Sequence, residues 1–328
     1  MPADQQEHTL LQIGSTSSRR RYARVATDVA MMAGMDACGN GTVPWPDGSG
    51  YSCEPLESAK NRAQAFLIAN LPPWDAINRG TLEGALLPTT VQSALQVRTE
   101  FPWAASVPEE VWMDYVLPYA SVNEAREDWR QLMFGALQEF VKNSTWQASS
   151  LTEVAQIVNE KVWEALRPQG PIHFKEQQTP LIYDPMSTTV FGYASCTGVS
   201  ILYIDALRSL GVPARLVGTP AWHGVVADGN HNWVEIWLGD GQGLRGEPWT
   251  FNEAKPAGPG EKFDTPCDKW FCNAGHFNGS TLTYAARFNR TAAGGAVFLP
   301  YPMAWDLENK NIPGVDRTSF YNAICGAC

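Results

Sequence analysis

"GYASCTGVSILYIDALRSLGVPARLVG", residues 192–218, has the pattern of a helix followed by a strand. Ser195 or Thr197 can cap a helix, and Gly211 can end it. The apolar positions between cap and end are Ile201, Leu202, Ile204, Ala206 and Leu207. Cys196 then lies in the first turn, where free N–H groups and the positive helix end favour a nucleophilic thiolate. A small buried cysteine is the structural alternative, so the question is whether a base lies nearby.

His231 is the strongest candidate for that base. The chain has five histidines, which are His8, His173, His223, His231 and His276. Residues 231–238 alternate in a period of two, which predicts a strand that begins at His231. A Gly-rich turn follows, and residues 248–254, "PWTFNEA", read as a second strand. The two segments predict an antiparallel hairpin.

The pairing of this hairpin decides which side chain can orient the imidazole. If Trp237 lies opposite Trp249, Glu253 shares a face with His231 and comes within reach of it. A one-residue bulge would bring Asn252 to that face instead, and an amide can also hold an imidazole. The alternation favours Glu253 and leaves Asn252 as the alternative. Cys196, His231 and one of these two residues would supply a nucleophile, a base and an orienting group.

At this point the sequence resembles the transglutaminase-like superfamily. The resemblance rests on "SCTGVSILYIDALRSLGVPARLVG", "GNHNWVEIW" and "PWTFNEA", in family order and at family spacing, over about residues 171–275. It implies an α+β fold with a papain-like core, in which Cys196 attacks a carboxamide and His231 transfers the proton. The residue that orients the histidine is usually Asp. This chain has Asn252 and Glu253 there, so the third role is the one that departs from the family pattern.

The resemblance implies cysteine chemistry on a protein or peptide substrate through a thioester. Family members transfer acyl groups to amines, hydrolyse amides, remove glycans from asparagine or are inactive, and the first two differ in what attacks the thioester. We find neither long all-β flanking domains nor a calcium-hand loop, which favours hydrolysis over protein-glutamine crosslinking. An inactive peptide- or glycan-binding module is the other alternative. Its groove could be lined by tryptophans such as Trp222, Trp233, Trp237, Trp249 and Trp270.

The oxyanion of such a reaction needs hydrogen-bond donors. The backbone N–H of Cys196 at the helix start is one. A second donor is expected in "FKEQQTP", residues 174–180, with Gln177 and Gln178 as candidates. An exposed polar loop is the alternative interpretation of this segment.

Composition and the spacing of apolar residues divide the rest of the chain into segments. Residues 124–143 have apolar residues at three- and four-residue spacing, and Ser150 and Glu153 have the spacing of a capping box, so both regions predict helices. The predicted divisions are a loop-rich segment at 1–56, a helical region at 57–170, a catalytic core at 171–275 and a C-terminal extension at 276–328.

Composition and charge limit the kinds of partner that the protein can bind. The chain has 328 residues, of which 44% are hydrophobic, and a formal net charge of −10. Such a charge argues against a nucleic-acid surface, and the one basic run, at residues 18–24, reads as a solvated tail. No stretch is long and apolar enough to span a bilayer, and the first residues do not resemble a signal peptide. We therefore expect a soluble globular protein with neither nucleic-acid partner nor membrane span, and the sequence does not indicate its oligomeric state.

Six further cysteines indicate in which cellular compartment the protein resides. They lie at positions 38, 53, 267, 272, 325 and 328, and neighbours in sequence could form local disulfides. Asn-x-Ser/Thr triplets begin at Asn40, Asn143, Asn278 and Asn289. Together these features favour an extracellular or secretory location. A zinc or redox site built from the last four cysteines and His276 is the alternative, but the spacing fits no standard zinc pattern, so no metal and no cofactor are expected.

Overall fold

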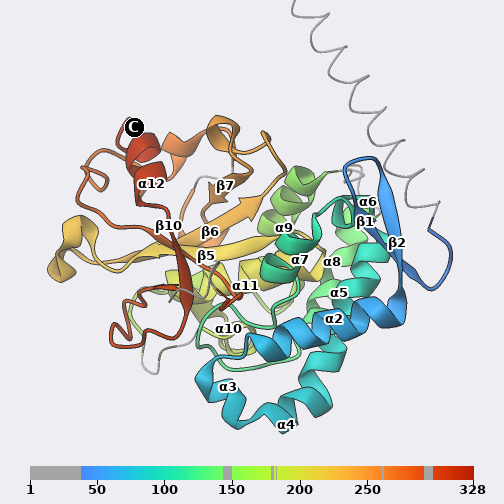
Figure 1. The fold of residues 1–328 in the computed structure, drawn as a ribbon. Helices are drawn as coiled ribbons and strands as arrows, with labels where there is room; N and C mark the ends of the chain where they lie inside the picture. The colour runs from blue at the N-terminus through green and yellow to red at the C-terminus, as the bar shows by residue number, and fades with distance from the viewer. Residues whose placement is uncertain (1–37, 143–149, 179–180, 182, 260–261, 292–297) are drawn as a thin grey trace, which may run out of the picture.

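A six-stranded antiparallel sheet organises the molecule (Figure 1). The computed structural model describes residues 38–142, 150–178, 181, 183–259, 262–291 and 298–328. The basic run at 18–24 and the triplet at Asn143 lie outside these residues. In spatial order the strands are β7 (Trp249–Asn252), β6 (His231–Trp237), β5 (Ala214–Thr219), β8 (Tyr284–Ala286), β10 (Pro313–Asp316) and β9 (Leu299–Pro300).

Helices cover one face of β5 and β6. The helix α11 (Cys196–Ser209) packs against both strands, as the apolar run in this segment predicts, and α8 (Arg130–Lys142) and α9 (Leu151–Ala165) pack against α11. Ser150 is the N-cap of α9, as predicted, because its side chain accepts a hydrogen bond from the backbone N–H of Glu153. Two short parallel strands, β3 (His173–Phe174) and β4 (Tyr193–Ala194), and α10 (Pro185–Phe191) precede α11. Together these helices and strands build the mixed α+β fold that the sequence predicts.

The N-terminal half adds a hairpin and further helices. The hairpin consists of β1 (Thr42–Pro46) and β2 (Tyr51–Pro55), where the sequence predicts mostly loop. Its Val43 and Trp45 are buried, so two side chains in a Gly- and Pro-rich stretch stabilise regular structure. The helices that follow are α2 (Leu56–Ala69), α3 (Pro73–Ile77), α4 (Arg79–Thr81), a π-helical turn η1 (Leu82–Leu86), α5 (Leu87–Glu100), α6 (Pro102–Ala105) and α7 (Glu109–Tyr115). One hydrophobic core joins residues of the predicted helical region and the predicted catalytic core.

The segment predicted as a C-terminal extension is part of the sheet. It contributes β8, β9 and β10, and then α12 (Thr318–Cys325). Side chains from this segment and from residues 271–277 form a second cluster with the sheet face opposite α11, around Trp233, Phe251 and Tyr321. Residues 276–328 therefore complete the fold around the predicted core rather than extending from it.

Three disulfides link the described cysteines, and only one pair is local. Cys38 bonds to Cys53, as neighbouring positions suggest. The other two local pairs are wrong, because Cys267 bonds to Cys328 and Cys272 bonds to Cys325. The fold lays α12 beside the segment at 266–273, which brings together cysteines that are more than fifty residues apart. These two disulfides include all four cysteines of the alternative zinc site, so none of the four is free to bind a metal ion.

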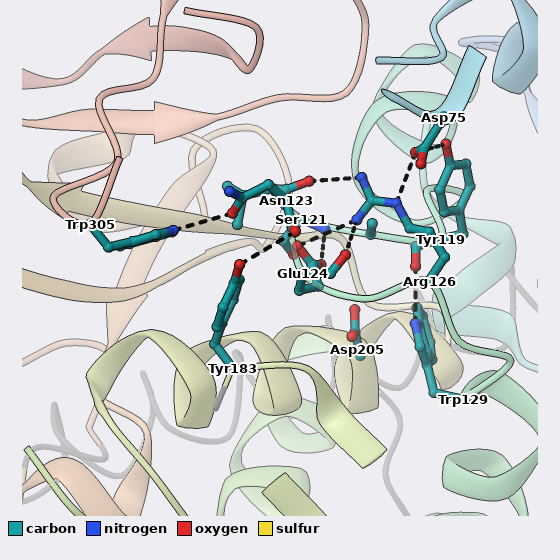
Figure 2. Close-up of polar contacts among 12 residues, drawn as sticks. Asp75, Tyr119, Ser121, Asn123, Glu124, Arg126, Trp129, Tyr183, Asp205 and Trp305 are labelled. Carbon is teal, nitrogen blue, oxygen red and sulfur yellow. Dashed lines mark hydrogen bonds and ion pairs between the residues drawn. The ribbon is translucent and has the colours of Figure 1, made fainter. Parts of the chain in front are cut away.

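The segment between α7 and α8 crosses over α11 and is held by polar contacts (Figure 2). Tyr119 and Arg126 both donate to a carboxylate oxygen of Asp75, at 2.7 and 2.8 Å. Glu124 accepts from the backbone N–H groups of Ser121 and Val122. Below them, Asp205 points from α11 toward this segment. Neither carboxylate oxygen of that residue has a hydrogen-bond partner in the described part of the chain.

Candidate active site

The helix start presents Cys196. Ser195 is the N-cap residue in extended conformation, although its side chain makes no capping hydrogen bond. From Thr197 to Ser209 every residue of α11 is buried, whereas Cys196 is partly exposed and forms no disulfide. The thiol therefore occupies the one position of this helix that reaches solvent. The N–H groups of the first helical turn have no carbonyl partner within the helix.

The β6–β7 hairpin brings His231 and Glu253 together. Trp237 pairs with Trp249, so the predicted register is confirmed. Glu253 follows directly on β7, and Nε2 of His231 donates to its Oε2 at 2.8 Å. Both side chains are buried. A buried carboxylate can therefore fix the orientation of the imidazole and stabilise its charged form.

The imidazole also faces the thiol. Burial lowers the pKa of His231, but the charge of Glu253 and hydrogen bonds with Cys196 and Glu253 outweigh burial and raise it to about 10. Burial raises the pKa of Cys196, but the hydrogen bond and charge of His231 and a hydrogen bond from the backbone of Asn232 outweigh it, so the pKa is lowered. The surroundings thus favour a thiolate beside an imidazolium, which is the reactive form of a cysteine nucleophile.

Asn252 lies on the other side of its strand. It pairs with Val234 in the hairpin, and its side chain lies near Tyr203 of α11. Its Oδ1 also accepts from the backbone N–H of Glu253 at 3.0 Å. The structure therefore brings Cys196, His231 and Glu253 together and directs Asn252 toward α11.

The segment expected to supply a second oxyanion donor runs beside the nucleophile. Strand β3 pairs with β4, and the N–H of Lys175 donates to the carbonyl of Ala194, two residues before Cys196. Gln178 turns its amide back to the carbonyl of Lys175, and Gln177 is exposed. Residues 179–180 lie outside the described part. A donor from either glutamine remains a prediction.

One residue that the sequence pattern did not single out holds the end of β7. Asn159 of α9 is buried, its Nδ2 donates to the carbonyl of Glu253 at 2.9 Å, and its Oδ1 accepts from the N–H of Lys255 at 3.0 Å. The only signal in the sequence was an amide within the apolar face of a helix. Its partners lie more than ninety residues away, so no local pattern identifies them.

A second unpredicted network ties the helix start to β6. Asn232 donates from Nδ2 to the hydroxyl of Thr197 at 2.9 Å and accepts at Oδ1 from the hydroxyl of Tyr301. Gly218 pairs with Asn232 across the strands, and a Cβ there would lie 2.3 Å from Oδ1. The absence of a side chain at Gly218 therefore leaves room for the amide of Asn232, which connects Thr197 at the helix start with Tyr301 in the C-terminal segment.

Four of the five tryptophans suggested for a groove are core residues. Trp222, Trp233, Trp237 and Trp249 are buried, whereas Trp270 is 43% exposed. Over the described ranges, no group of His, Cys, Asp or Glu side chains is arranged to hold a metal ion. No helix in these ranges is long and apolar enough to cross a membrane.

Comparison with known proteins finds one family model that matches part of the chain. Residues 137–250 match the model of the transglutaminase-like superfamily, so this segment is transglutaminase-like, in agreement with the resemblance of its motifs. The match begins within α8, includes Cys196 and His231 and ends three residues before Glu253. No curated protein matches the chain. The superfamily generally uses a cysteine for acyl transfer or hydrolysis.

Proposed function

We propose that the protein is an enzyme with a papain-like core that cleaves or transfers the acyl group of a carboxamide in a protein or peptide. The observation that carries this proposal is the position of His231, which faces Cys196 on one side and hydrogen bonds to the carboxylate of Glu253 on the other. The partial exposure of Cys196 supports access of a substrate. Its three disulfides support residence in an oxidising compartment outside the cytosol.

The reaction would proceed in two halves. The thiolate of Cys196 attacks the carbonyl carbon, a C–S bond forms, and N–H groups at the start of α11 stabilise the oxyanion. When the C–N bond breaks, the imidazolium of His231 donates its proton to the leaving nitrogen, which leaves a thioester. Water then attacks, His231 takes its proton, and cleavage of the C–S bond releases the acid and restores the thiolate. Glu253 stabilises the imidazolium before the first proton transfer and after the second.

We favour water over an amine as the attacking group. The described residues form helices, one six-stranded sheet and two two-stranded sheets, and no separate all-β unit is found among them. Protein-glutamine acyltransfer shares the first half of the reaction and differs in the second. Both reactions release ammonia from glutamine-containing peptides. Only transfer also incorporates an added primary amine into the peptide, so the amount of amine incorporated per ammonia released distinguishes the two.

The first prediction concerns the nucleophile and the base. Cys196→Ala and His231→Ala should each reduce turnover at least about a thousandfold, and the double variant should lose little more, because the two residues act as one unit. Iodoacetamide should alkylate Cys196 of the native protein at neutral pH faster than a free thiol, because the thiolate reacts. Turnover retained in Cys196→Ala would refute the proposal. Slow alkylation without turnover would identify a binding module.

A further inference from the structure

Trp270 lies in a segment that two disulfides hold. Residues 266–273 carry Trp270 between Cys267 and Cys272, and both cysteines bond to residues at the end of α12 or just after it. The buried amine of Lys269 donates to the carbonyls of Lys262 and Thr265. The segment is therefore fixed from both ends although it has little regular structure.

The indole reaches the His231–Glu253 pair. Its Nε1–H donates to Oε2 of Glu253 at 3.1 Å, and this is the same oxygen that accepts from His231. The ring centroid lies 4.7 Å from that of His231. Gly258 packs against the indole, where a Cβ would come within 2.8 Å of Cδ1. Backbone and side chain together define one position for this tryptophan.

The second oxygen of Glu253 explains why the contact matters. Oε1 is buried and has no hydrogen-bond partner in the described residues. The orientation of the carboxylate therefore depends on two donors to Oε2, the imidazole of His231 and the indole of Trp270. The imidazole exchanges its proton during the proposed reaction, whereas the indole N–H is a permanent donor.

We propose that Trp270 is a positioning residue that holds Glu253 in line with His231, and that the disulfides Cys267–Cys328 and Cys272–Cys325 hold Trp270 in place. This inference rests on the proposed function. Without the indole, the carboxylate of Glu253 can rotate away from His231. A smaller fraction of the protein then has the imidazolium in the orientation that the reaction needs. The exposed ring leaves the side chain open to replacement without loss of a buried core residue.

The test uses Trp270→Phe, which keeps an aromatic ring and removes the N–H. On a glutamine-containing peptide that the wild-type protein turns over, kcat should fall about tenfold, as expected for loss of a hydrogen bond to a charged group, with KM nearly unchanged. The alkaline limb of the pH profile should move to lower pH, because the imidazolium is less stabilised. Trp305→Phe is the matched control, since it removes an indole bond to Asn123 (Figure 2) and should leave that limb in place.

Two further measurements separate positioning from folding. In a Glu253→Gln background, Trp270→Phe should cost much less than in the wild type, because the two residues act together. Removal of Cys272 and Cys325 by alanine substitution should lower kcat and shift the alkaline limb as Trp270→Phe does. Removal of Cys38 and Cys53 is the matched control and should do neither.

Unchanged kcat and pH profile in Trp270→Phe, or equal losses in the wild-type and Glu253→Gln backgrounds, would overturn the inference. A rise in KM alone would also overturn it and make Trp270 a substrate contact. These results are distinct from failure of the proposed function, in which Cys196→Ala itself would retain turnover.

Discussion

At the scale of single residues, the site depends on which side chain faces His231. Strand alternation places Glu253 on the face of Trp249 and Phe251, and the 2.8 Å contact with His231 follows from that register. Asn252 points to α11. A carboxylate and an amide can each orient an imidazole, but the carboxylate also stabilises the imidazolium. The raised pKa of His231 reflects that charge.

Replacement of Glu253 by Gln tests this distinction. Gln can still accept a hydrogen bond but carries no charge, so the pKa of His231 should fall and the alkaline limb of kcat/KM should move down by about one to two pH units. The sign follows from the raised pKa of His231, because the negative charge of Glu253 keeps the imidazole protonated to higher pH. Asn252→Ala should leave the shape of the profile unchanged. If Asn252→Ala removed most activity and Glu253→Gln were silent, Asn252 would have the third role.

At the scale of elements, α11 combines a reactive start with a buried carboxyl group in its middle. Asp205 is fully buried, and the nearest cation is Nη1 of Arg208, at 3.9 Å from its Oδ1. Burial raises the pKa of Asp205 well above its usual value; Arg208 and Arg130 lower it, and Glu124 and Glu127 raise it further. The folded protein therefore binds this proton more tightly than the unfolded chain does.

Asp205→Asn should stabilise the protein. The contribution of the protonated carboxyl is complete below the unfolded pKa, near pH 4, and is lost as pH rises toward the folded pKa, so the variant should gain roughly 1–2 kcal/mol at pH 8 and little at pH 4. Arg208 keeps its partners, because it donates to three backbone carbonyls. Asp114→Asn is the control and should destabilise, since Oδ2 of that carboxylate pairs with Nη2 of Arg287 at 3.0 Å, and an amide nitrogen in its place cannot accept. Urea unfolding at both pH values measures the difference, and a loss of stability in Asp205→Asn would contradict the argument.

Local pattern predicted the elements of the site but not the contacts between distant segments. The helix at 196–209 and the hairpin at 231–252 follow from apolar spacing and alternation, which act over a few residues. Asn159 and Trp270 reach Glu253 through tertiary packing, so the nearby sequence does not reveal these contacts. The two nested disulfides, Cys267–Cys328 and Cys272–Cys325, were not predicted for the same reason. The hairpin at 42–55 was not predicted because Gly, Pro and polar residues outnumber the few buried side chains that stabilise it.

At the scale of the whole molecule, one buried carboxylate joins the sheet to its C-terminal part. Glu235 of β6 accepts from Arg215 of β5 at 2.6 Å, from Arg317 before α12 at 2.8 Å and from Tyr321 of α12 at 3.0 Å. Burial raises the pKa of Glu235, but the two arginines outweigh burial and lower it. Tyr321 also accepts from the indole of Trp233, which lies two residues from His231.

Arg317→Met should therefore lower the free energy of unfolding by about 2–3 kcal/mol at neutral pH, because it leaves a buried carboxylate partly unpaired. The stabilisation exists above the unfolded pKa of Glu235 and is lost as pH falls through the folded pKa, so the penalty should shrink in acid. Arg245→Met removes an exposed bond to Ala323 and should cost less than about 1 kcal/mol. Equal losses in the two variants at neutral pH would show that burial of Glu235 does not set the cost.

The strand order also has a consequence for how the chain is made. Strand β10 lies between β8 and β9, and Arg317 and Tyr321 follow it. A ribosome releases Cys196, His231 and Glu253 well before it releases these residues. While translation continues, the nascent chain holds its nucleophile beside an unfinished sheet in which Glu235 lacks two of its partners. Emergence of residues 313–325 closes the sheet, pairs Glu235 and brings Cys325 to Cys272, so the site is completed last.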